Sequence, residues 1–222
     1  MVSLNNLFRK KAQPVLGLDI GSSSIRLVEL DNTSTGQWVL ERCLIAQLPP
    51  NVVASDGTIE QLDTLIAAVR RIVKKSESRT KQVVAALPAS AVIAKKVILP
   101  EGLGEDEMDA QIESEASQYI PFALEEVSID YYVMGASATS VGDADVMIVA
   151  ARKDRVGDMQ ALMSEAGMHL KVLDVASYAA QSAAERIIEN LPNAGKDAII
   201  ALVHVGASSI YVYVMRNGEV LF

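Results

Sequence analysis

The sequence predicts a mixed α/β (α+β) protein, and two observations lead to this class. Stretches in which apolar and polar residues alternate, as in strands, are interleaved with stretches whose apolar residues recur every three or four positions, as in helices. In addition, residues 18–25 (LDIGSSSI) return in similar form at 203–210 (VHVGASSI). Each copy has a glycine and hydroxyl residues between strand-like flanks, so we expect two β-hairpins with similar bends.

Composition narrows the class of protein further. Of the 222 residues, 50% are hydrophobic and 22% are charged, which is typical of a globular chain. The net charge of −8 argues against a nucleic-acid partner, because phosphate backbones require a cationic surface. The single Cys43 excludes an internal disulfide and fits a reducing compartment. No apolar run reaches the roughly 18 residues that cross a bilayer, so we expect a cytoplasmic protein.

Residues 1–14 are expected to form an N-terminal tail. Apolar residues at positions 1, 4, 7 and 8 precede three consecutive cations at 9–11. This pattern fits either a weak membrane-surface helix, which would make the protein peripheral to a membrane, or a frayed or partner-docked segment.

The first layer is predicted to contain four strands and a helix. Residues 15–21, 24–31 and 38–48 indicate a three-stranded meander, and the first copy of the repeat lies at its first bend. Residues 58–75 indicate an amphipathic helix, and residues 82–87 a short strand. The apolar face of the helix comprises Ile59, Leu62, Leu65, Ile66, Val69, Ile72 and Val73.

An inserted subdomain is expected at residues 91–174. Six predicted elements follow one another there in the order β-α-β-β-α-β, which is typical of a small split sheet with helices on one face. A long helix at 176–189 then returns the chain to the first layer, so that 15–90 and 175–196 form one core subdomain. The expected strands of the insertion are 91–99, 127–135, 144–151 and 169–174, and its expected helices are 105–120 and 154–166.

Residues 197–222 are expected to begin a second half of the fold. Residues 197–205 and 209–216 indicate the second hairpin, and Asn217-Gly218 favours another tight turn. Four residues follow that turn. We therefore expect a chain truncated at its C-terminus, with the second half largely missing.

The two similar bends favour the binding of an anion. Successive backbone N–H groups in such a bend form a concavity for a phosphate, and glycine lets the phosphate approach closely. Two bends that face each other across a cleft would hold a polyphosphate from both sides. The alternative is two ordinary hairpins with small residues in their turns.

The order of the elements resembles the actin-like ATPase superfamily, which has a ribonuclease H-like core, and the insertion is similar in position to that of FtsA. Residues 113–122 (ESEASQYIPF) and 17–24 (GLDIGSSS) resemble the PilM family of type IV pilus assembly proteins. The same family likeness extends to residues 124–127, 130–131, 166–168 and 173–174.

This resemblance implies a cytoplasmic protein, peripheral to the inner membrane, that binds ATP and Mg²⁺ between its two halves. It also implies that a groove between the core and the insertion holds the N-terminal cytoplasmic segment of PilN. Through PilN the protein would join other pilus platform proteins and the motor ATPases. Two alternatives stay open: a self-associating, filament-forming protein like FtsA, and a small-molecule kinase of the same superfamily.

The resemblance also implies roles for the residues of the two bends. In the first bend, phosphate contacts fall to Gly21, Ser22, Ser23 and Ser24, and Asp19 would reach Mg²⁺ through its water ligands. The alternative for Asp19 is a carboxylate that caps the turn. Arg26 follows on the outgoing strand, on the same side as Ser24, and is a further candidate for a phosphate. The corresponding residues of the second bend are Gly206, Ala207, Ser208 and Ser209.

His204 stands where the superfamily commonly has an acid. A neutral imidazole is a poor ligand for Mg²⁺, and a charged one would repel the ion. We therefore expect nucleotide binding with slow or no hydrolysis, unless His204 is merely a residue at a strand end. The sequence shows no Ser-His-Asp, Cys-His or paired-carboxylate constellation for catalysis.

The partner groove is expected near Tyr119, Ile120, Pro121 and Phe122, where an aromatic residue follows the helix-ending proline. The competing interpretation is packing of the insertion against the main body. Six acids crowd residues 105–115. They suit a helix N-terminus, because the helix dipole favours negative charge there, or an acidic rim that attracts basic residues of the partner.

Overall fold

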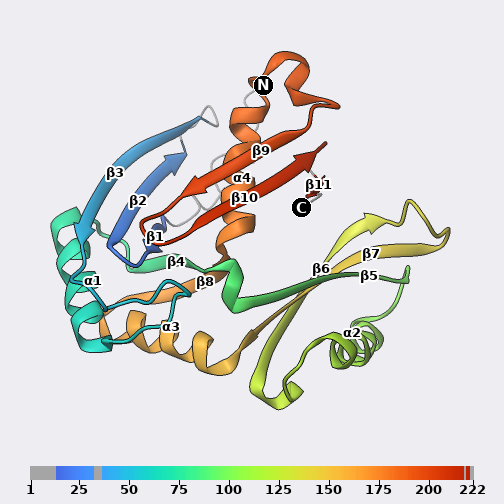
Figure 1. Ribbon diagram of the computed structural model, residues 1–222, viewed down its shortest axis with the longest axis horizontal. Coiled ribbons are helices and arrows are strands. Elements are labelled where there is room, and N and C mark those ends of the chain that lie inside the picture. Colours follow the sequence, from blue (N-terminus) through green and yellow to red (C-terminus); the bar gives the residue numbers. More distant parts are fainter. Residues whose placement is uncertain (1–13, 33–36, 218, 221–222) are drawn as a thin grey trace, which may run out of the picture.

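The computed structural model describes residues 14–32, 37–217 and 219–220. It contains one five-stranded sheet and two three-stranded sheets, with helices packed between and around them (Figure 1). The predicted tail at residues 1–14 lies outside the described residues except for Pro14. Within the described ranges, no helix is both long and apolar enough to cross a membrane.

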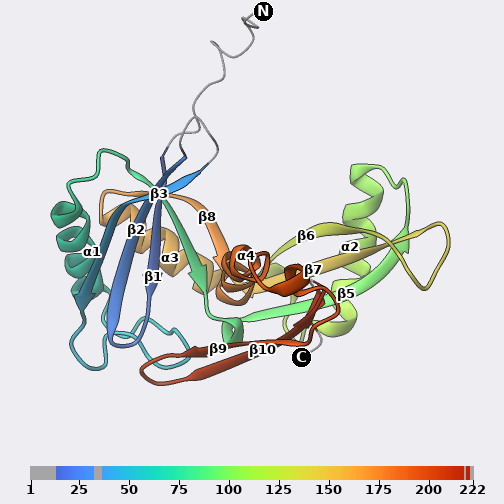
Figure 2. The same ribbon diagram turned by 90° about the horizontal axis from the view of Figure 1, so that it is seen from above.

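The five-stranded sheet has the order β3-β2-β1-β4-β8. Its first three strands form the predicted antiparallel meander, and β4 and β8 add to it in parallel. These two parallel strands end side by side, next to the first bend of the meander (Figure 2). The bounds are β1 (Leu16–Ile20), β2 (Ser24–Asn32), β3 (Trp38–Gln47), β4 (Gln82–Leu87) and β8 (His169–Val175).

Two helices, α1 (Leu62–Ser76) and α3 (Lys153–Glu165), share one hydrophobic core with this sheet. Most residues of their apolar faces are buried, as helical spacing predicts, although Leu62 at the start of α1 is 37% exposed. At the end of α1, Arg42 of β3 donates to the Ser76 carbonyl at 2.7 Å and to the Glu29 carboxylate at 2.8 Å. The buried helix residues are Leu65, Ile66, Ala68, Val69, Ile72, Met159, Leu162 and Met163.

The predicted start of the first helix at Thr58 is wrong, because α1 begins at Leu62. The Asp56 carboxylate accepts hydrogen bonds from the backbone N–H and the hydroxyl of Thr58, at 2.9 and 2.6 Å. A β-bridge also joins Val53 and Ile59. These local contacts give residues 53–59 a loop conformation that competes with helix.

The insertion contains a second sheet of order β5-β7-β6, which is antiparallel throughout. The helix α2 (Glu105–Tyr119) packs on one face, and its capping box pairs the Gly104 N–H with the Glu107 carboxylate. The three strands are β5 (Val92–Pro100), β6 (Val127–Ala136) and β7 (Asp143–Arg152). The shared core comprises Val97, Leu99, Met108, Ile112, Val146 and Ile148.

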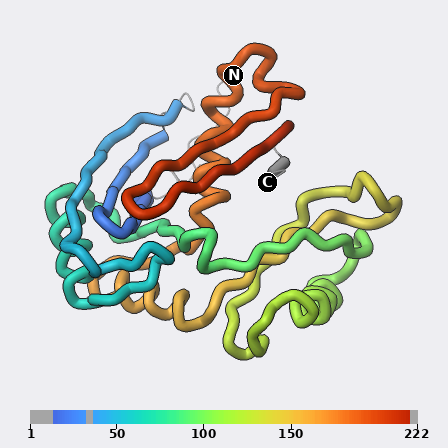
Figure 3. The backbone as a smooth tube through the Cα atoms, viewed as in Figure 1, coloured from blue at the N-terminus to red at the C-terminus, as the bar shows by residue number. Residues whose placement is uncertain are grey.

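The six elements of the expected insertion occur in the predicted order, but the prediction that they share one sheet is wrong. β8 pairs with β4 in the five-stranded sheet, and α3 buries Leu162 and Met163 in the core of that sheet. The inserted sheet therefore ends at Arg152 rather than near residue 174. The tube in Figure 3 follows the chain out of the first layer after β4 and back into it through α3.

After β8, the helix α4 (Ala176–Ile188) packs against β4 and β8. The third sheet follows with the order β11-β10-β9, and it contains the predicted second hairpin. The short 3-10 turns are η2 (Ala89–Ala91), η3 (Leu124–Glu126) and η4 (Pro192–Gly195). The strands of the third sheet are β9 (Ile200–Val205), β10 (Ile210–Arg216) and β11 (Glu219–Val220).

Candidate functional site

The two similar bends of the sequence lie against each other in space. The Ser22 and Ser208 hydroxyl oxygens are 2.8 Å apart and share a hydrogen bond. Both bends are closed in the same way, because the Gly21 N–H donates to the Ser24 carbonyl at 3.0 Å and the Gly206 N–H donates to the Ser209 carbonyl at 2.9 Å. The prediction that the bends oppose each other is confirmed.

A cavity of about 610 Å³, called here the larger cavity, opens beside the two bends. Its walls also include the ends of β4 and β8, the loop at residues 53–57, one face of α4 and the inner face of the β9–β10 hairpin. Its size is within the range of small-molecule and cofactor sites. All ten residues predicted for phosphate contact line it: Asp19, Gly21, Ser22, Ser23, Ser24, Arg26, Gly206, Ala207, Ser208 and Ser209.

The two glycines differ in how much space their bends leave for a side chain. Neither Gly21 nor Gly206 has a positive φ, so neither bend needs glycine for its backbone angle. A Cβ on Gly21 would meet the Ser24 carbonyl at an ordinary 3.5 Å. A Cβ on Gly206 would lie 3.0 Å from the Ser209 carbonyl, so that bend is the one whose geometry favours glycine.

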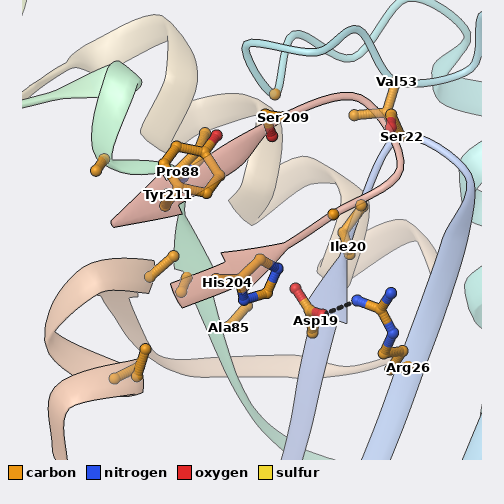
Figure 4. A pocket seen from close by; sticks show the side chains of 18 of the residues that line it. Asp19, Ile20, Ser22, Arg26, Val53, Ala85, Pro88, His204, Ser209 and Tyr211 are labelled. Carbon is orange, nitrogen blue, oxygen red and sulfur yellow. Dashed lines mark hydrogen bonds and ion pairs between the residues drawn. The ribbon is translucent and has the colours of Figure 1, made fainter. Parts of the chain in front are cut away.

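Asp19 and Arg26 form an ion pair at the edge of the larger cavity. They lie directly opposite each other in the β1–β2 register, and the Arg26 guanidinium is 2.7 Å from the Asp19 carboxylate (Figure 4). The side chains are 59% and 43% exposed, so solvent screens the pair. Asp19 is therefore paired with a cation rather than free, and Arg26 places that cation at the cavity.

The residues present fit Mg²⁺ in one way only. The carboxylates that line the larger cavity are Asp19 and Asp174, and the described residues contain no group of three metal-ligating side chains. Mg²⁺ often keeps several waters and is bound by one or two carboxylates together with substrate phosphates. Asp19 suits such a water-mediated contact to an ion that arrives with a polyphosphate.

His204 faces Asp19 from the second hairpin (Figure 4). Its ring contacts the edge of the Tyr211 ring, with the centroids 6.1 Å apart. Burial raises the pKa of the neighbouring Tyr213, with a smaller contribution from Tyr211, so this phenol stays protonated at neutral pH. The second hairpin thus presents an imidazole and phenols to the cavity, with no carboxylate.

A smaller cavity of about 160 Å³ lies where the inserted sheet meets α3. Of the four residues predicted for the partner groove, Phe122 lines it, with the Arg152 guanidinium 5.4 Å from the centre of its ring. Ile120 is buried in the core of the insertion, and Tyr119 lies under the Lys95 ammonium at 4.7 Å. Pro121 is exposed and does not line the cavity. The other lining residues are Ser90, Ala91, Val92, Ile93, Val127, Ala150, Ala151 and Arg155.

The family model for the type IV pilus assembly protein PilM matches residues 17–222. The chain belongs to the PilM family. The predicted family and the predicted mixed α/β class are confirmed, and the type IV pilus is the system in which the family acts.

Solved structures place this PilM-family chain among its relatives. A PilM–PilN type IV pilus biogenesis complex matches 94% of the chain at 26% identity with a TM-score of 0.79. This chain covers 60% of the matched chain. The cytoplasmic domain of EpsL, from the type II secretion system of Vibrio cholerae, gives 16% identity and a TM-score of 0.48, covering 73% of this chain and 57% of that one. A protein with an actin-like ATPase fold from Bacteroides thetaiotaomicron is 11% identical, with a TM-score of 0.49. The match covers 97% of this chain and 70% of that one.

Sequence reasoning gave no site role to Asp174, although it lines the larger cavity of this PilM-family chain. Asp174 lies at the carboxyl end of β8, where its carboxylate accepts a hydrogen bond from the Val175 N–H at 2.7 Å. Residues at the carboxyl ends of adjacent parallel strands often meet in a binding crevice. The pairing of β4 with β8 is the signal that identifies Asp174, and this pairing was not predicted from the sequence.

Proposed function

We propose that this chain is an ATP-binding adaptor of type IV pilus assembly, which binds the N-terminal segment of PilN at the cytoplasmic side of the inner membrane. The observation that carries the proposal is the pair of opposed bends around the larger cavity in a PilM-family chain. Through PilN the adaptor would meet other platform proteins and the motor ATPases. The PilM–PilN complex of a relative supports PilN as the partner.

The proposed nucleotide site uses the two bends as a clamp for the phosphates. The hydroxyls of Ser22 and Ser208 meet beside the cavity that both bends line, and a phosphate there would replace the hydrogen bond between them and accept from backbone N–H groups of the bends. Arg26 supplies the positive charge of this clamp. When bound, Mg²⁺ would neutralise phosphate charge, and Asp19 would contact its waters.

The same site gives little support for hydrolysis. The lining residues offer Asp19, Asp174 and His204 as groups that could accept a proton, and Asp19 is already paired with Arg26. An effective general base must lie within hydrogen-bond reach of an attacking water and have a suitable pKa. We therefore propose that the nucleotide is bound and turned over slowly or not at all.

The proposed PilN site is the smaller cavity between the insertion and the core. Its aliphatic walls and the Phe122 ring suit an apolar side chain of an extended segment, and Arg152 and Arg155 suit backbone carbonyls or a carboxylate beside it. Tyr119, Ile120 and Pro121 would act around it, with Ile120 packed in the same core as Val127 and Ala150, which line the cavity.

Isothermal titration calorimetry with magnesium–ATP tests the nucleotide site. We expect binding to the unaltered chain and weaker binding after Gly206→Ala, because the added Cβ would crowd the bend. Gly157→Ala is the matched control, since a Cβ at Gly157 meets nothing within 4 Å and Gly157 lines neither cavity. Absence of binding to the unaltered chain, or equal loss in both variants, would contradict the proposed clamp.

A labelled peptide with the sequence of the PilN N-terminus tests the partner site by fluorescence anisotropy. Phe122→Ala is expected to weaken binding by about ten-fold, because an aromatic anchor in a pocket is a typical hot spot. Tyr119→Ala should have a smaller effect, since Tyr119 does not line the smaller cavity. Equal binding by the Phe122 variant and the unaltered chain would place the peptide elsewhere.

A further inference from the structure

One short segment of the chain contributes residues to both cavities. Pro88 and Ala89 line the larger cavity, whereas Ser90 and the three residues that follow it line the smaller cavity. The segment contains the η2 turn and connects β4 of the core to β5 of the insertion. A displacement of this segment in the larger cavity would therefore also change the shape of the smaller cavity.

The loop at residues 53–57 packs tightly against this segment. Gly57 has φ +83, and a Cβ built on it would lie 2.5 Å from Cγ of Pro88. No side chain fits between the loop and the segment, so the two surfaces touch through backbone and ring. Close-packed contacts of this kind transmit displacement because they leave no free volume.

Asp56 provides a second connection, and its side chain lines neither cavity. Its neighbours Ser55 and Gly57 line the larger cavity, while its carboxylate is 3.6 Å from the guanidinium of Arg155, which lines the smaller cavity. The hydrogen bonds from Thr58 fix the carboxylate in place. Together with Arg155 they lower the pKa of Asp56, so the pair stays charged at neutral pH.

Arg152, the other cation of the smaller cavity, is engaged differently. Its guanidinium binds the Asp154 carboxylate at 2.6 Å and lies over the Phe122 ring. Among the described residues, the ion pair that joins the loop of the larger cavity to the wall of the smaller one is that of Asp56 with Arg155.

We infer that Asp56, Arg155 and the Gly57–Pro88 contact couple the two cavities, so that a nucleotide in the larger cavity raises the affinity of the smaller one for its peptide. This inference rests on the proposed function. A nucleotide that contacts Ser55 and Gly57 would shift the loop as a unit, and Asp56, fixed within that loop, would carry the Arg155 guanidinium to the position that the peptide requires. The coupling is reciprocal, so the peptide must raise the affinity for the nucleotide by the same factor.

The test measures the affinity of the labelled PilN peptide for the chain with and without saturating magnesium–ATP. We expect the nucleotide to tighten peptide binding by about five-fold, at the lower end of known couplings. The ratio of the peptide affinity with nucleotide to that without it should fall below about two in Asp56→Asn, although this residue lines neither cavity. Arg155→Gln should lower the ratio equally and also weaken the peptide, and Arg155→Lys should restore part of the ratio.

The matched control is Asp197→Asn. Asp197 is about as exposed as Asp56, forms an ion pair with Arg216 at 3.9 Å, lines neither cavity, and has a φ of +59 that asparagine tolerates. The ratio of peptide affinities with and without nucleotide should be the same in Asp197→Asn as in the unaltered chain.

The outcomes separate the coupling from the proposed function. A ratio of one in the unaltered chain, or an unchanged ratio in Asp56→Asn, would overturn the coupling while leaving both binding sites intact. An unaltered chain that binds no nucleotide or no peptide would overturn the proposed function and the coupling together. A double variant of Asp56 and Arg155 should match the single variants, and an additive further loss would show that the two residues act independently.

Discussion

The two bends have nearly the same sequence and the same hydrogen-bonded closure, yet they differ in what supports them. The first bend connects two strands of the five-stranded sheet, and both Ser24 and Ile25 are buried. The second belongs to a hairpin whose corresponding residues, Ser209 and Ile210, are partly or fully exposed. The local motif therefore sets the geometry of a bend, and the surrounding core sets its rigidity.

In the proposed clamp, the two bends would have different roles. The first bend is fixed by the core and provides Arg26 and Asp19, whereas the second is carried by a hairpin that has little core of its own. A ligand that bridges both bends would find the first already in place, so the entropic cost of ordering would fall mainly on the second.

The largest expected difference concerns the equivalent isoleucines of the repeat. Ile25→Ala should lower the free energy of unfolding by about 3 kcal/mol, because it leaves a cavity in a fully buried site. Ile210→Ala should change it by less than about 0.5 kcal/mol, since that side chain is 65% exposed. Urea unfolding followed by circular dichroism measures both, and similar losses would show that the second hairpin is as well supported as the first.

The ion pair of Arg42 with Glu29 joins β3 to β2, the strand that follows the first bend. Its removal measures how much this part of the sheet contributes to stability. Arg42→Ala leaves the Glu29 carboxylate buried without its guanidinium, so we expect a loss of about 2 kcal/mol in the same unfolding experiment. Lys96→Ala, which removes an exposed cation from an ion pair of the inserted sheet, is the control and should cost less than about 1 kcal/mol. Equal losses would argue that Glu29 is solvated.

The glycines sharpen the comparison at the level of ligand binding. Gly206→Ala should weaken magnesium–ATP about ten-fold and Gly21→Ala about two-fold, because the added Cβ is 3.0 Å from a carbonyl oxygen in one bend and 3.5 Å in the other. Calorimetry gives both affinities. The reverse order would mean that the first bend, rather than the second, closes on the phosphates.

The smallest expected effect concerns the loop beside the clamp. The hydrogen bonds from Thr58 lower the pKa of Asp56, first through the side chain and then through the backbone, and Arg155 adds to them. Since the folded-state pKa is below the unfolded value, this stabilisation is present above the unfolded pKa and is lost as the pH falls through the folded one. Thr58→Val removes the hydroxyl but keeps the backbone N–H, so it should raise the pKa of Asp56 in an NMR titration, and an unchanged pKa would exclude the Thr58 hydroxyl as the main cause.

Local pattern predicted most of the elements and both bends, because periodicity and the Gly-Ser sequences are properties of short segments. It could not assign α3 and β8 to the first layer, since the pairing of β8 with β4 joins residues that are far apart in sequence. The Asp19–Arg26 pair depended in the same way on the register between two strands. The site role of Asp174 followed only once that pairing was known.

At the start of α1 the prediction failed for a local reason, because short-range hydrogen bonds override a periodic pattern. Ile59 continues the apolar spacing of the helix, but the Asp56–Thr58 hydrogen bonds and the Val53–Ile59 bridge fix a loop there. In the segment 119–122, the pattern identified a helix end followed by an aromatic residue. Which side chain enters a cavity was decided by the β5, β7 and α3 surfaces around Phe122.

Cys43 gives this chain a built-in reporter. It is exposed on β3, directly opposite Val28, and Val28 lines the larger cavity. Since the sequence contains no second cysteine, a maleimide dye would attach at this one position without any mutation. The emission of this dye would report changes in β3, the strand next to the one that lines the larger cavity.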